Sequence, residues 1–402
     1  MAATSQETSV AVVGAGPVGL YTALLLGRAG IDVTLYESRD SLIDFPRAIM
    51  IHRLVLEDFK KTGVYDDVID RSFVNTEGGV YCKPGGEILI SIDGSPDHPI
   101  VHCSQDRVQD VLFKHLQQQP TCKIIFNATL QTLEQSSDVA VLNFINDGKP
   151  LQVRAKLVVG ADGSKSTVRK QLGLPLDGFT WTDNIRVATD IDYDLKDAGL
   201  RPAAFVVDPV YYASICRLGK GRGVRFDTGE PWPESRDGEW DEEEAKARVR
   251  HRLSRIIGPS AAQAPIIRMA MYRAHQRCVP NFVKGRVALA GDAAHLTNPT
   301  GGLGLTSGIL DAALLGRVLV RILKNGEPYD KLLADYDSER HGVFTNYVDP
   351  TATRNRKRVL GTDPDDLAER ESFFARLRAG DVEWLEAQFR EEQVMSSTRD
   401  MP

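Results

Sequence analysis

One carboxylate, Asp292, stands directly after a short apolar run at residues 287–290 and ahead of a glycine-rich loop. The loop carries one proline and three glycines: Pro299, Gly301, Gly302 and Gly304. An apolar stretch follows at residues 309–319, so the pattern predicts a buried strand, a loop and a helix, with Thr306 or Ser307 as the N-cap. Glycines ahead of a helix let backbone amides approach a bound group, and the helix N-terminus adds partial positive charge. We therefore expect a site for a ligand that holds or gains negative charge.

A second pattern, near the N-terminus, has the spacing of a dinucleotide site. A β-branched run at residues 9–13 leads into Gly14-Ala-Gly16-Pro-Val-Gly19 and a helix, and a second strand at residues 31–36 ends at Glu37. The first glycine makes the turn, the second lets the backbone approach a pyrophosphate, and the third allows helix and strand to pack closely. Glu37 can accept hydrogen bonds from ribose hydroxyls. The pattern predicts a dinucleotide ligand and leaves open whether it is NAD or FAD.

A third apolar run, at residues 157–159, also ends in a glycine turn that carries an acid, Gly160-Ala-Asp162-Gly163. Like the element at residues 291–292, it is expected to be a buried strand that delivers a carboxylate to one edge of a nucleotide.

Residues 176–275 contain no nucleotide pattern of their own. Short β-rich runs predict a mainly antiparallel sheet there, at residues 185–191, 204–207, 211–217 and 223–226. The whole chain therefore predicts an α/β fold with a discontinuous Rossmann-like domain at residues 1–175 and 276–345. An antiparallel β-sheet domain that binds the substrate is expected at residues 176–275. A C-terminal helical segment is expected at residues 346–402, with apolar stripes that pack on the core or on a dimer partner.

Length and composition exclude several classes of protein. The chain has 402 residues, of which 42% are hydrophobic and 26% charged, as in a soluble globular protein. The net charge of −6 argues against a nucleic-acid partner. Five scattered cysteines without a C-x-x-C pair predict a reducing, cytoplasmic location and no metal site or disulfide framework. The polar start predicts no signal peptide, and glycines interrupt the one candidate membrane span, residues 10–26.

The three glycine motifs, in the order 14–19, 160–163 and 291–304, resemble those of the class A flavoprotein monooxygenases, the para-hydroxybenzoate hydroxylase-like aromatic hydroxylases. The resemblance covers residues 8–345 and includes Arg47-Ala48 and Gln105 at their expected places. It implies FAD bound in an extended pose by the discontinuous domain, with the β-sheet domain lying over the isoalloxazine ring. One departure is Thr306, where the family often has Asn, which affects one hydrogen bond to the flavin edge.

The resemblance also implies which residues bind the cofactors. The FAD pyrophosphate and adenosine ribose would be held by Gly14, Gly16, Gly19 and Glu37. The pyrophosphate and ribityl region would be reached by Arg47 and Gln105. Asp292 would bind a ribityl hydroxyl or a phosphate-bound water, and Asp162 would serve the flavin and NAD(P)H region together. The pyrimidine edge and the oxygen-reacting carbon of the flavin would face the backbone of Pro299, Gly301, Gly302, Leu303 and Gly304.

The activity implied by the resemblance is insertion of one oxygen atom from O2 into an aromatic, phenolic or polyketide-like small molecule, with NAD(P)H as reductant and a flavin C4a-hydroperoxide as the oxygen donor. The protein must then stabilise the anionic reduced flavin, exclude water and favour the substrate phenolate. The candidate residues at the substrate are His52, Tyr211, Tyr212, Arg225, His295 and Pro299. Tyr211 and Tyr212 are adjacent, so we expect them to point to opposite faces of the sheet. A monomer or a homodimer is expected.

Other classes of function explain part of the pattern. Baeyer–Villiger insertion or epoxidation on the same fold is not separated from hydroxylation by the sequence. A non-enzymatic binding protein, like the GDP-dissociation inhibitors, keeps a glycine fingerprint but does not require the 291–304 loop. An NAD-dependent dehydrogenase would leave residues 160–163 and 291–304 without a role. A flavin halogenase is disfavoured, because the chain has no Trp-x-Trp-x-Ile-Pro segment.

Overall fold

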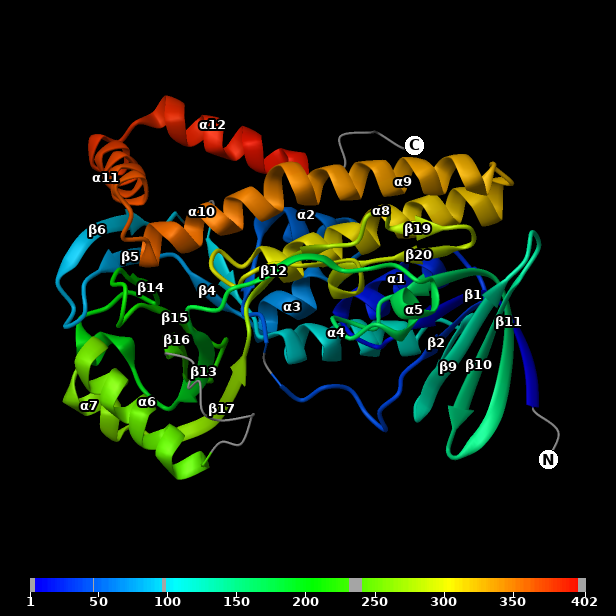
Figure 1. Ribbon diagram of the computed structural model, residues 1–402, viewed down its shortest axis with the longest axis horizontal. Helices are drawn as coiled ribbons and strands as arrows, with labels where there is room; N and C mark the ends of the chain where they lie inside the picture. The colour runs from blue at the N-terminus through cyan, green and yellow to red at the C-terminus, as the bar shows by residue number, and fades with distance from the viewer. Residues whose placement is uncertain (1–3, 46, 96–98, 231–240, 397–402) are drawn as a thin grey trace.

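The computed structural model describes residues 4–45, 47–95, 99–230 and 241–396. Two large sheets lie toward opposite ends of an elongated molecule, and helices α9 (Tyr329–Val343) and α10 (Asp349–Leu360) run along one side from one sheet toward the other (Figure 1). The predicted α/β fold, with a Rossmann-like part, an antiparallel sheet and C-terminal helices, is confirmed.

The larger sheet has eight strands, in the order β19-β20-β11-β1-β2-β8, with β10 and β9 added beside β11. Its strands are β1 (Thr4–Val13), β2 (Val33–Tyr36), β8 (Cys122–Ile125), β9 (Ala128–Gln135), β10 (Ala140–Asn146), β11 (Lys149–Gly160), β19 (Val283–Lys284) and β20 (Val287–Leu289). Strands β20, β11, β1 and β2 are parallel neighbours, with Gly160 paired to both Val13 and Leu289. Because parallel strands end at one edge of a sheet, the three glycine motifs meet at this edge.

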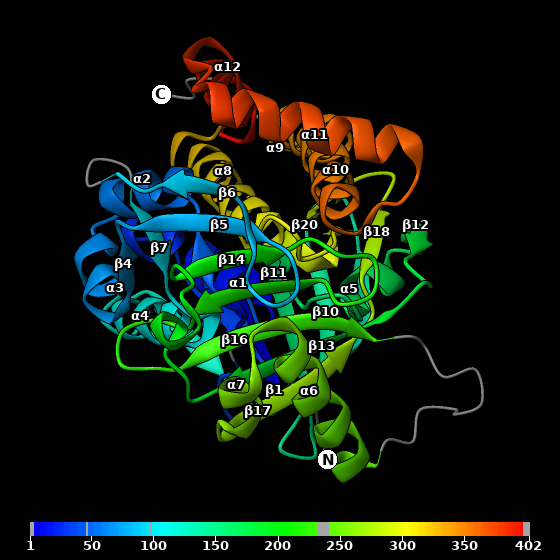
Figure 2. The ribbon, with the colours of Figure 1, turned by 90° about the vertical axis from the view of Figure 1, so that its left-hand side faces the viewer.

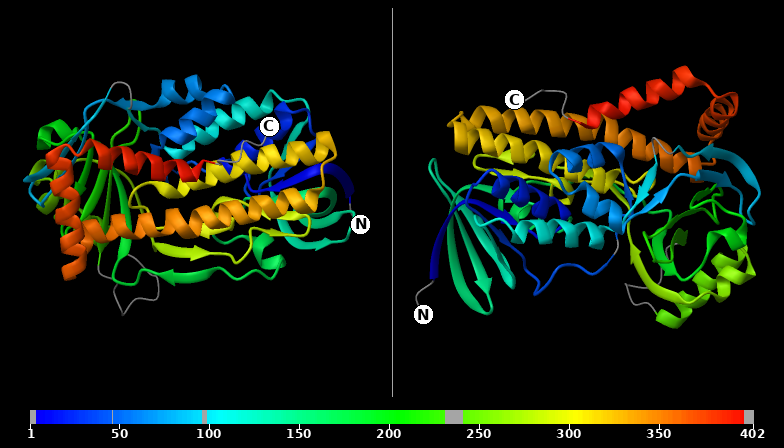
Figure 3. Two further views of the ribbon diagram at one scale, coloured as in Figure 1. Left: turned by 90° about the horizontal axis from the view of Figure 1, so that it is seen from above. Right: turned by 180° about the vertical axis from the view of Figure 1, so that it is seen from behind.

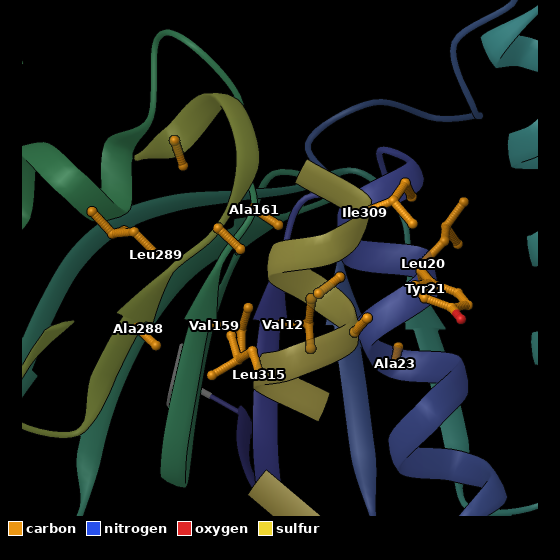
Figure 4. Close-up of a cluster of buried hydrophobic side chains, with 14 of the residues drawn as sticks. Val12, Leu20, Tyr21, Ala23, Val159, Ala161, Ala288, Leu289, Ile309 and Leu315 are labelled. Atoms are coloured by element: carbon orange, nitrogen blue, oxygen red, sulfur yellow. The ribbon is translucent and has the colours of Figure 1, made fainter. Parts of the chain in front are cut away.

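Helices α1 (Pro17–Arg28) and α8 (Leu303–Asn325) pack together against this sheet. Leu315 of α8 points toward Val12 and Val159 of adjacent strands (Figure 4), and all three are fully buried. Gly316 lets the helices approach, because a Cβ there would lie 2.7 Å from a Leu25 methyl. Helix α8 is long and apolar enough to cross a membrane, but 78% of its most apolar window is buried inside the molecule, as in the core helix of a folded domain.

The second sheet has seven strands, in the order β17-β13-β16-β15-β14-β5-β6, and every pair except β14–β5 is antiparallel. Its strands are β5 (Gly78–Cys82), β6 (Ile88–Asp93), β13 (Ile185–Ile191), β14 (Ala203–Val206), β15 (Ala213–Arg217), β16 (Val224–Glu230) and β17 (Ile266–Tyr272). The predicted mainly antiparallel sheet is therefore confirmed. Two of its strands come from residues 78–93, outside the range 176–275, because β5 pairs in parallel with β14.

Helices α6 (Glu242–Ile256) and α7 (Pro259–Gln263) cover one face of the seven-stranded sheet (Figure 2). We call the opposite face the inner face. It is formed by alternate residues of β13, β16 and β17, among them Arg186, Asp227 and Tyr272.

The remaining elements connect and cover the two sheets. They are α2 (Arg53–Lys61), α3 (Tyr65–Arg71), α4 (Gln105–Gln117), α5 (Thr167–Gln171) and the small sheets β3-β7-β4 and β12-β18-β21. The C-terminal helices α11 (Pro364–Ala379) and α12 (Val382–Glu392) turn back beside α10 (Figure 3). Phe374 of α11 is buried against Tyr81 of β5, with ring centroids 5.2 Å apart, so this segment packs on the core as expected.

Candidate active site

The glycine turn after β1 lies against the turn after β11. Gly14 has φ +105°, and a Cβ there would lie 2.5 Å from the carbonyl oxygen of Ala161. A Cβ on Gly19 would lie 2.0 Å from the carbonyl oxygen of Gly14, so both close approaches require glycine. Gly16 differs, because, its chain neighbours apart, no atom of the described residues lies within 4 Å of its Cβ position. The second glycine of the motif therefore borders open space.

Helix α1 begins beside that space with its amides available. It has no side-chain cap and no acidic residue in its first turn, and Pro17 occupies its first position. Glu37, at the end of β2, accepts hydrogen bonds from the backbone N–H of Ala15 at 2.8 Å and of Arg39 at 3.0 Å. The Glu37 carboxylate thus fixes the glycine turn and stays partly exposed. Unpaired amides at a helix start favour an anion such as a pyrophosphate.

The loop before β3 (Met50–Ile51) lies against the start of α4. The backbone N–H of Gln105 donates to the Ala48 carbonyl at 2.9 Å, and the Gln105 side chain donates to Gln109 at 3.2 Å. Arg47 is exposed, and its charge acts on Asp292. The structure therefore brings the predicted residues Arg47 and Gln105 together at the edge where the glycine motifs meet.

Asp162 is engaged within its own loop. One carboxylate oxygen accepts from the Ser166 hydroxyl at 2.5 Å, and the other accepts from the backbone N–H groups of Thr167 at 2.6 Å and Val168 at 3.1 Å. Burial raises the pKa of Asp162, and these hydrogen bonds lower it in part. The carboxylate caps α5, while the backbone of Ala161 and Asp162 supports Gly14. Its predicted role at the flavin and NAD(P)H stays a prediction.

Asp292 follows β20 and has a different environment. Its side chain reaches solvent, and no described residue donates a hydrogen bond to its carboxylate. The surrounding protein nevertheless raises the pKa of Asp292 by burial, and His295 and Arg47 lower it in part. An unpaired acid with a raised pKa, at the edge shared by the three glycine motifs, suits contact with ligand hydroxyl groups.

The turn after Asp292 is fixed by Gln276 of β18 (His275–Cys278). The Gln276 side-chain carbonyl accepts from the backbone N–H of Asn298 at 2.5 Å and from the Asn298 side chain at 3.0 Å. Asn298 in turn accepts from the backbone N–H of Thr300 at 3.0 Å, and the Gly302 N–H donates to the Pro299 carbonyl at 3.1 Å. These bonds hold the 297–302 turn in one shape.

Helix α8 starts earlier than the sequence predicts. It begins at Leu303, with Gly302 as the N-cap at φ +70°, and it has no side-chain cap and no acid in its first turn. The prediction that Thr306 or Ser307 is the N-cap is wrong, because glycine can take the left-handed conformation that ends the turn. The Thr306 hydroxyl instead donates to the Gly302 carbonyl at 3.1 Å, inside the helix. The first amides of α8 are consequently free to face a ligand.

A buried charged group supports the 291–295 segment from behind. Asp311 of α8 accepts from the Gly291 N–H at 2.9 Å, lies 2.7 Å from His295 Nε2 and accepts from Arg340 Nε at 2.6 Å. Arg340 also donates to the Met395 carbonyl at 2.8 Å. Asp311, His295 and Arg340 are at most 1% exposed. His295 is stacked between aromatic rings, with Phe344 at 4.7 Å, so it positions the loop.

These features fit FAD. Two uncapped helix starts at the carboxyl edge of one parallel sheet suit a pyrophosphate and an anionic ring edge, and Asp292 suits a hydroxylated linker between them. The residues that the structure describes contain no group of three or more His, Cys, Asp or Glu side chains that could hold a metal. A cavity of about 160 Å³ lies elsewhere, between Phe73, Leu195 and Arg217, and none of the candidate residues lines it.

Comparison with known proteins agrees with this fit. Residues 7–351 match the family described as "FAD binding domain". The chain is 35% identical over 373 residues to para-nitrophenol 4-monooxygenase from Pseudomonas sp. strain WBC-3, covering 91% of this chain and 90% of that protein. It is 30% identical over 368 residues to 6-hydroxy-3-succinoylpyridine 3-monooxygenase HspB from Pseudomonas putida, covering 90% and 91%. The crystal structure of p-nitrophenol 4-monooxygenase PnpA from Pseudomonas putida DLL-E4 superposes with a TM-score of 0.90 at 33% identity, covering 98% of this chain and all of that one.

The chain belongs to the FAD-dependent aromatic hydroxylases. It is an FAD-dependent monooxygenase, and NAD(P)H is the usual reductant of this family.

The predicted substrate-contacting residues of the hydroxylase lie in separate places. His52 is the N-cap of α2 and pairs with Glu392 of α12 at 3.4 Å. Tyr211 packs under α6, 5.4 Å from Arg252, whereas the Tyr212 ring lies 4.8 Å from Arg186 on the inner face, so the two tyrosines point to opposite faces as predicted.

Arg225 lies on the inner face, but its guanidinium is already paired. It donates to both carboxylate oxygens of Asp190, at 2.5 and 2.9 Å, and to the Arg47 carbonyl at 3.0 Å. Arg225 therefore ties the seven-stranded sheet to the loop that carries Arg47. The predicted catalytic roles of His52, Tyr211 and Arg225 receive no support from these contacts, and Pro299 alone of the four lies in the 297–302 turn.

Several buried or hydrogen-bonded residues that support the 291–304 segment or lie on the inner face could not be chosen from the sequence. They are Gln276, Asn298, Asp311, Arg340 and, on the inner face, Arg186, Asp227 and Tyr272. Each acts through a partner that is distant in the chain, so no local spacing marks it. Asp311 gave the one available signal, an acid within an apolar helix.

Asp292→Ala should weaken FAD binding by about 10- to 100-fold, the range for losing a hydrogen bond to a charged group. The unliganded protein should not be destabilised, because the Asp292 side chain reaches solvent and no described residue donates a hydrogen bond to its carboxylate. Flavin titration and urea unfolding of the apoprotein would measure both effects. Asp365→Ala, which removes an exposed acid of α11, is the matched control. Unchanged FAD affinity in Asp292→Ala would reject the assignment.

Proposed function

We propose that this hydroxylase inserts one oxygen atom from O2 into small phenols, such as para-nitrophenol, with NAD(P)H as reductant. The observation that carries the proposal is the 297–304 segment, held by Gln276 and ending at the uncapped start of α8, on the side where the seven-stranded sheet contacts the FAD-binding part. The names of the relatives, a nitrophenol and a hydroxypyridine monooxygenase, support the substrate class.

In the proposed complex, FAD lies across the carboxyl edge of the eight-stranded sheet. The start of α1 and the Gly14–Gly19 turn would hold its pyrophosphate, with Glu37 at the adenosine ribose and Arg47 and Gln105 nearby. Asp292 would accept hydrogen bonds from ribityl hydroxyls. The backbone of residues 299–304 and the start of α8 would stabilise negative charge at the pyrimidine edge. Bound FAD supplies the transfer of electrons from NAD(P)H and of one oxygen atom from O2 to the substrate ring.

The protein's own task is then to hold the phenol, keep water away and favour the ionised hydroxyl. We propose that the inner face of the seven-stranded sheet does this. Arg225 on that face binds the carbonyl of Arg47, so the sheet itself contacts the FAD-binding part. Gln276 of β18, four residues after β17 ends, binds Asn298 and fixes the chain on the other side of this region. A substrate site enclosed on two sides in this way suits hydroxylation of a planar aromatic ring.

The test is a spectrum followed by a product analysis. The purified protein should be yellow or bind added FAD, and 4-nitrophenol should accelerate NADH or NADPH oxidation. Isotopically labelled O2 should place one labelled oxygen in the product. Attack at the carbon that bears the nitro group would also release nitrite. A protein that never binds FAD, or that oxidises NAD(P)H at the same rate with and without phenols, would overturn the proposal.

The same experiment separates the alternatives. Epoxidation or Baeyer–Villiger insertion would leave phenols unchanged and oxidise alkenes or ketones. A non-enzymatic binding protein of the GDP-dissociation-inhibitor type would show neither flavin nor turnover. We propose a cytoplasmic location, because all five cysteines are free thiols, and a monomer or homodimer.

A further inference from the structure

One buried amide, that of Gln276, links helix α10 to the turn that precedes α8. Its side-chain carbonyl accepts from the Thr297 hydroxyl at 3.2 Å and from the backbone and side-chain nitrogens of Asn298 at 2.5 and 3.0 Å. Its NH2 group donates to the Asp349 carbonyl at 3.3 Å, to the carboxylate of the same residue and to the Thr353 hydroxyl at 3.3 Å. Gln276 is 2% exposed, so these hydrogen bonds are made away from solvent.

The hydrogen bonds through Gln276 run in one direction. The Thr300 N–H donates to the Asn298 side-chain oxygen at 3.0 Å, and the Asn298 side chain donates to Gln276. Gln276 in turn donates to the carboxylate of Asp349. Because a backbone N–H only donates and an ionised carboxylate only accepts, the Gln276 amide fits in a single orientation. Aligned hydrogen bonds also polarise one another. We call Asn298, Gln276 and Asp349 the amide relay.

The amide relay acts on the peptide group between Pro299 and Thr300. This group is held at both ends, because its N–H donates to Asn298 and its carbonyl accepts from the Gly302 N–H at 3.1 Å. Gly302 is also the N-cap of α8. The relay therefore fixes the direction of this peptide group together with that of the first α8 amides. In the proposed complex, this backbone faces the pyrimidine edge of FAD.

Helix α10 contacts the same turn at a second place. The side-chain nitrogen of Asn355 lies 2.6 Å from the Cβ position of Gly301. The Asn355 side-chain oxygen accepts from Arg358 Nη1 at 3.0 Å, and Arg358 is paired with Glu369 of α11 at 2.6 Å. Helix α11 thus fixes the residue of α10 that packs on Gly301, and the turn has α10 as its support along both of these contacts.

Resting on the proposed function, we propose that the amide relay positions the flavin-facing backbone for the reaction with O2, and that Asp349 of α10 acts on this reaction through Gln276. The three relay residues are positioning residues, since they act through the turn. A turn held in one shape keeps its N–H groups and the start of α8 directed at the negative charge of the pyrimidine edge.

Breaking the amide relay should divert electrons from the phenol to O2. A turn that takes several shapes stabilises that charge less well, so a larger share of turnovers should end without oxygen transfer. In such a turnover NAD(P)H, O2 and one proton give NAD(P)+ and hydrogen peroxide. The two electrons of NAD(P)H then reduce O2, and the phenol leaves unchanged.

Gln276→Ala and Asp349→Ala break the relay at different places. In the apoprotein of either variant, the bonded N–H groups of Asn298, Thr300 and Gly302 should exchange with solvent about 2- to 10-fold faster, the range for losing one hydrogen bond. In the FAD-loaded enzyme with 4-nitrophenol, the ratio of hydrogen peroxide to hydroxylated product should rise by about the same 2- to 10-fold. Hydrogen exchange read by mass spectrometry and a peroxide assay would measure the two effects.

Two further variants test whether Asp349 acts through Gln276. Asp349→Asn keeps a side-chain oxygen that accepts from Gln276, so it should restore most of the wild-type exchange and product ratio. The double variant Gln276→Ala/Asp349→Ala should differ little from Gln276→Ala alone, because residues of one hydrogen-bond network are not additive. Asp330→Ala, which removes an exposed acid from the first turn of α9, is the matched control and should behave as wild type.

Additive effects in the double variant would show that Asp349 acts apart from Gln276 and would overturn the inference. The same holds if the wild type hydroxylates phenols and both single variants keep its amide exchange and its peroxide ratio. A wild-type holoenzyme that neither binds nor oxidises any phenol would instead overturn the proposed function, and with it the role of the relay in the reaction.

Discussion

Asp311→Ala should lower the free energy of unfolding by about 3–5 kcal/mol, the cost of leaving a buried charge without its partner. The variant leaves the guanidinium of Arg340 without its carboxylate partner and removes the acceptor of the Gly291 N–H. Asp311, Arg340 and Gly291 are all buried. Urea unfolding of the apoprotein at neutral pH would measure the change. Glu371→Gln, which breaks an exposed ion pair with Arg378, should change the same quantity by less than about 1 kcal/mol.

The effect of Asp311 should also depend on pH in a defined direction. Burial would raise the pKa of Asp311, but His295 and Arg340 lower it to about 2, below the ordinary value of 3.8. A carboxyl with a lowered pKa stabilises the fold above its unfolded value, and that contribution is lost as the pH falls through the folded value. The difference between wild type and Asp311→Ala should thus be full above about pH 4 and shrink by about 2–3 kcal/mol toward pH 2. A pH-independent difference, or one no larger than that of Glu371→Gln, would contradict this account.

Gly16→Val should leave the unliganded fold intact and weaken FAD binding by about 100-fold or more, equivalent to about 3 kcal/mol. Its φ of −68° is accessible to any residue, and no described atom lies within 4 Å of its Cβ position. The added side chain would therefore meet the ligand and not the protein. Flavin titration and thermal unfolding of the apoprotein, measured side by side, would separate the two effects.

Gly342→Ala in α9 is the control for the glycine change itself. Its Cβ position has one neighbour at 3.8 Å, so this variant should keep FAD affinity and gain about 0.5–1 kcal/mol of helix stability. If Gly16→Val bound FAD as tightly as Gly342→Ala, the pyrophosphate could not lie against this turn.

The sequence predicted those parts of the site that a continuous stretch of chain encodes. The Gly160 and Gly291 turns each carry a strand, a glycine and an acid within a few residues, and the Gly14 motif carries a strand and three glycines, with its acid, Glu37, at the end of the next strand. The parallel pairing of β20, β11 and β1 brings the three turns together. The antiparallel sheet followed from alternating residues, and the sequence also predicts the hairpin of β5 and β6. The place of this hairpin in the sheet was not predicted, because β5 pairs with β14, more than a hundred residues away.

The parts that the sequence did not predict depend on pairs of distant residues. Arg186 and Asp227 are 41 positions apart, and Gln276 and Asn298 are 22 apart, so no periodicity links them. The start of α8 was misplaced because a hydroxyl was preferred as N-cap, whereas the N-cap is Gly302, in the left-handed conformation, four residues before Thr306. Substrate contacts were sought at Tyr211, whose neighbours on α6 only the fold reveals.

The hydrogen bond from Arg340 to the Met395 carbonyl, together with the place of β20 in the sheet, bears on how this enzyme is made in the cell. Synthesis proceeds from the N-terminus, so the Gly14 turn leaves the ribosome long before β20 and Met395. Until then the nascent chain lacks β20, whose end carries the Gly291 turn. It also lacks Met395, whose carbonyl accepts a hydrogen bond from Arg340 behind that turn. We therefore expect FAD to bind stably only after the chain as far as residue 395 has left the ribosome.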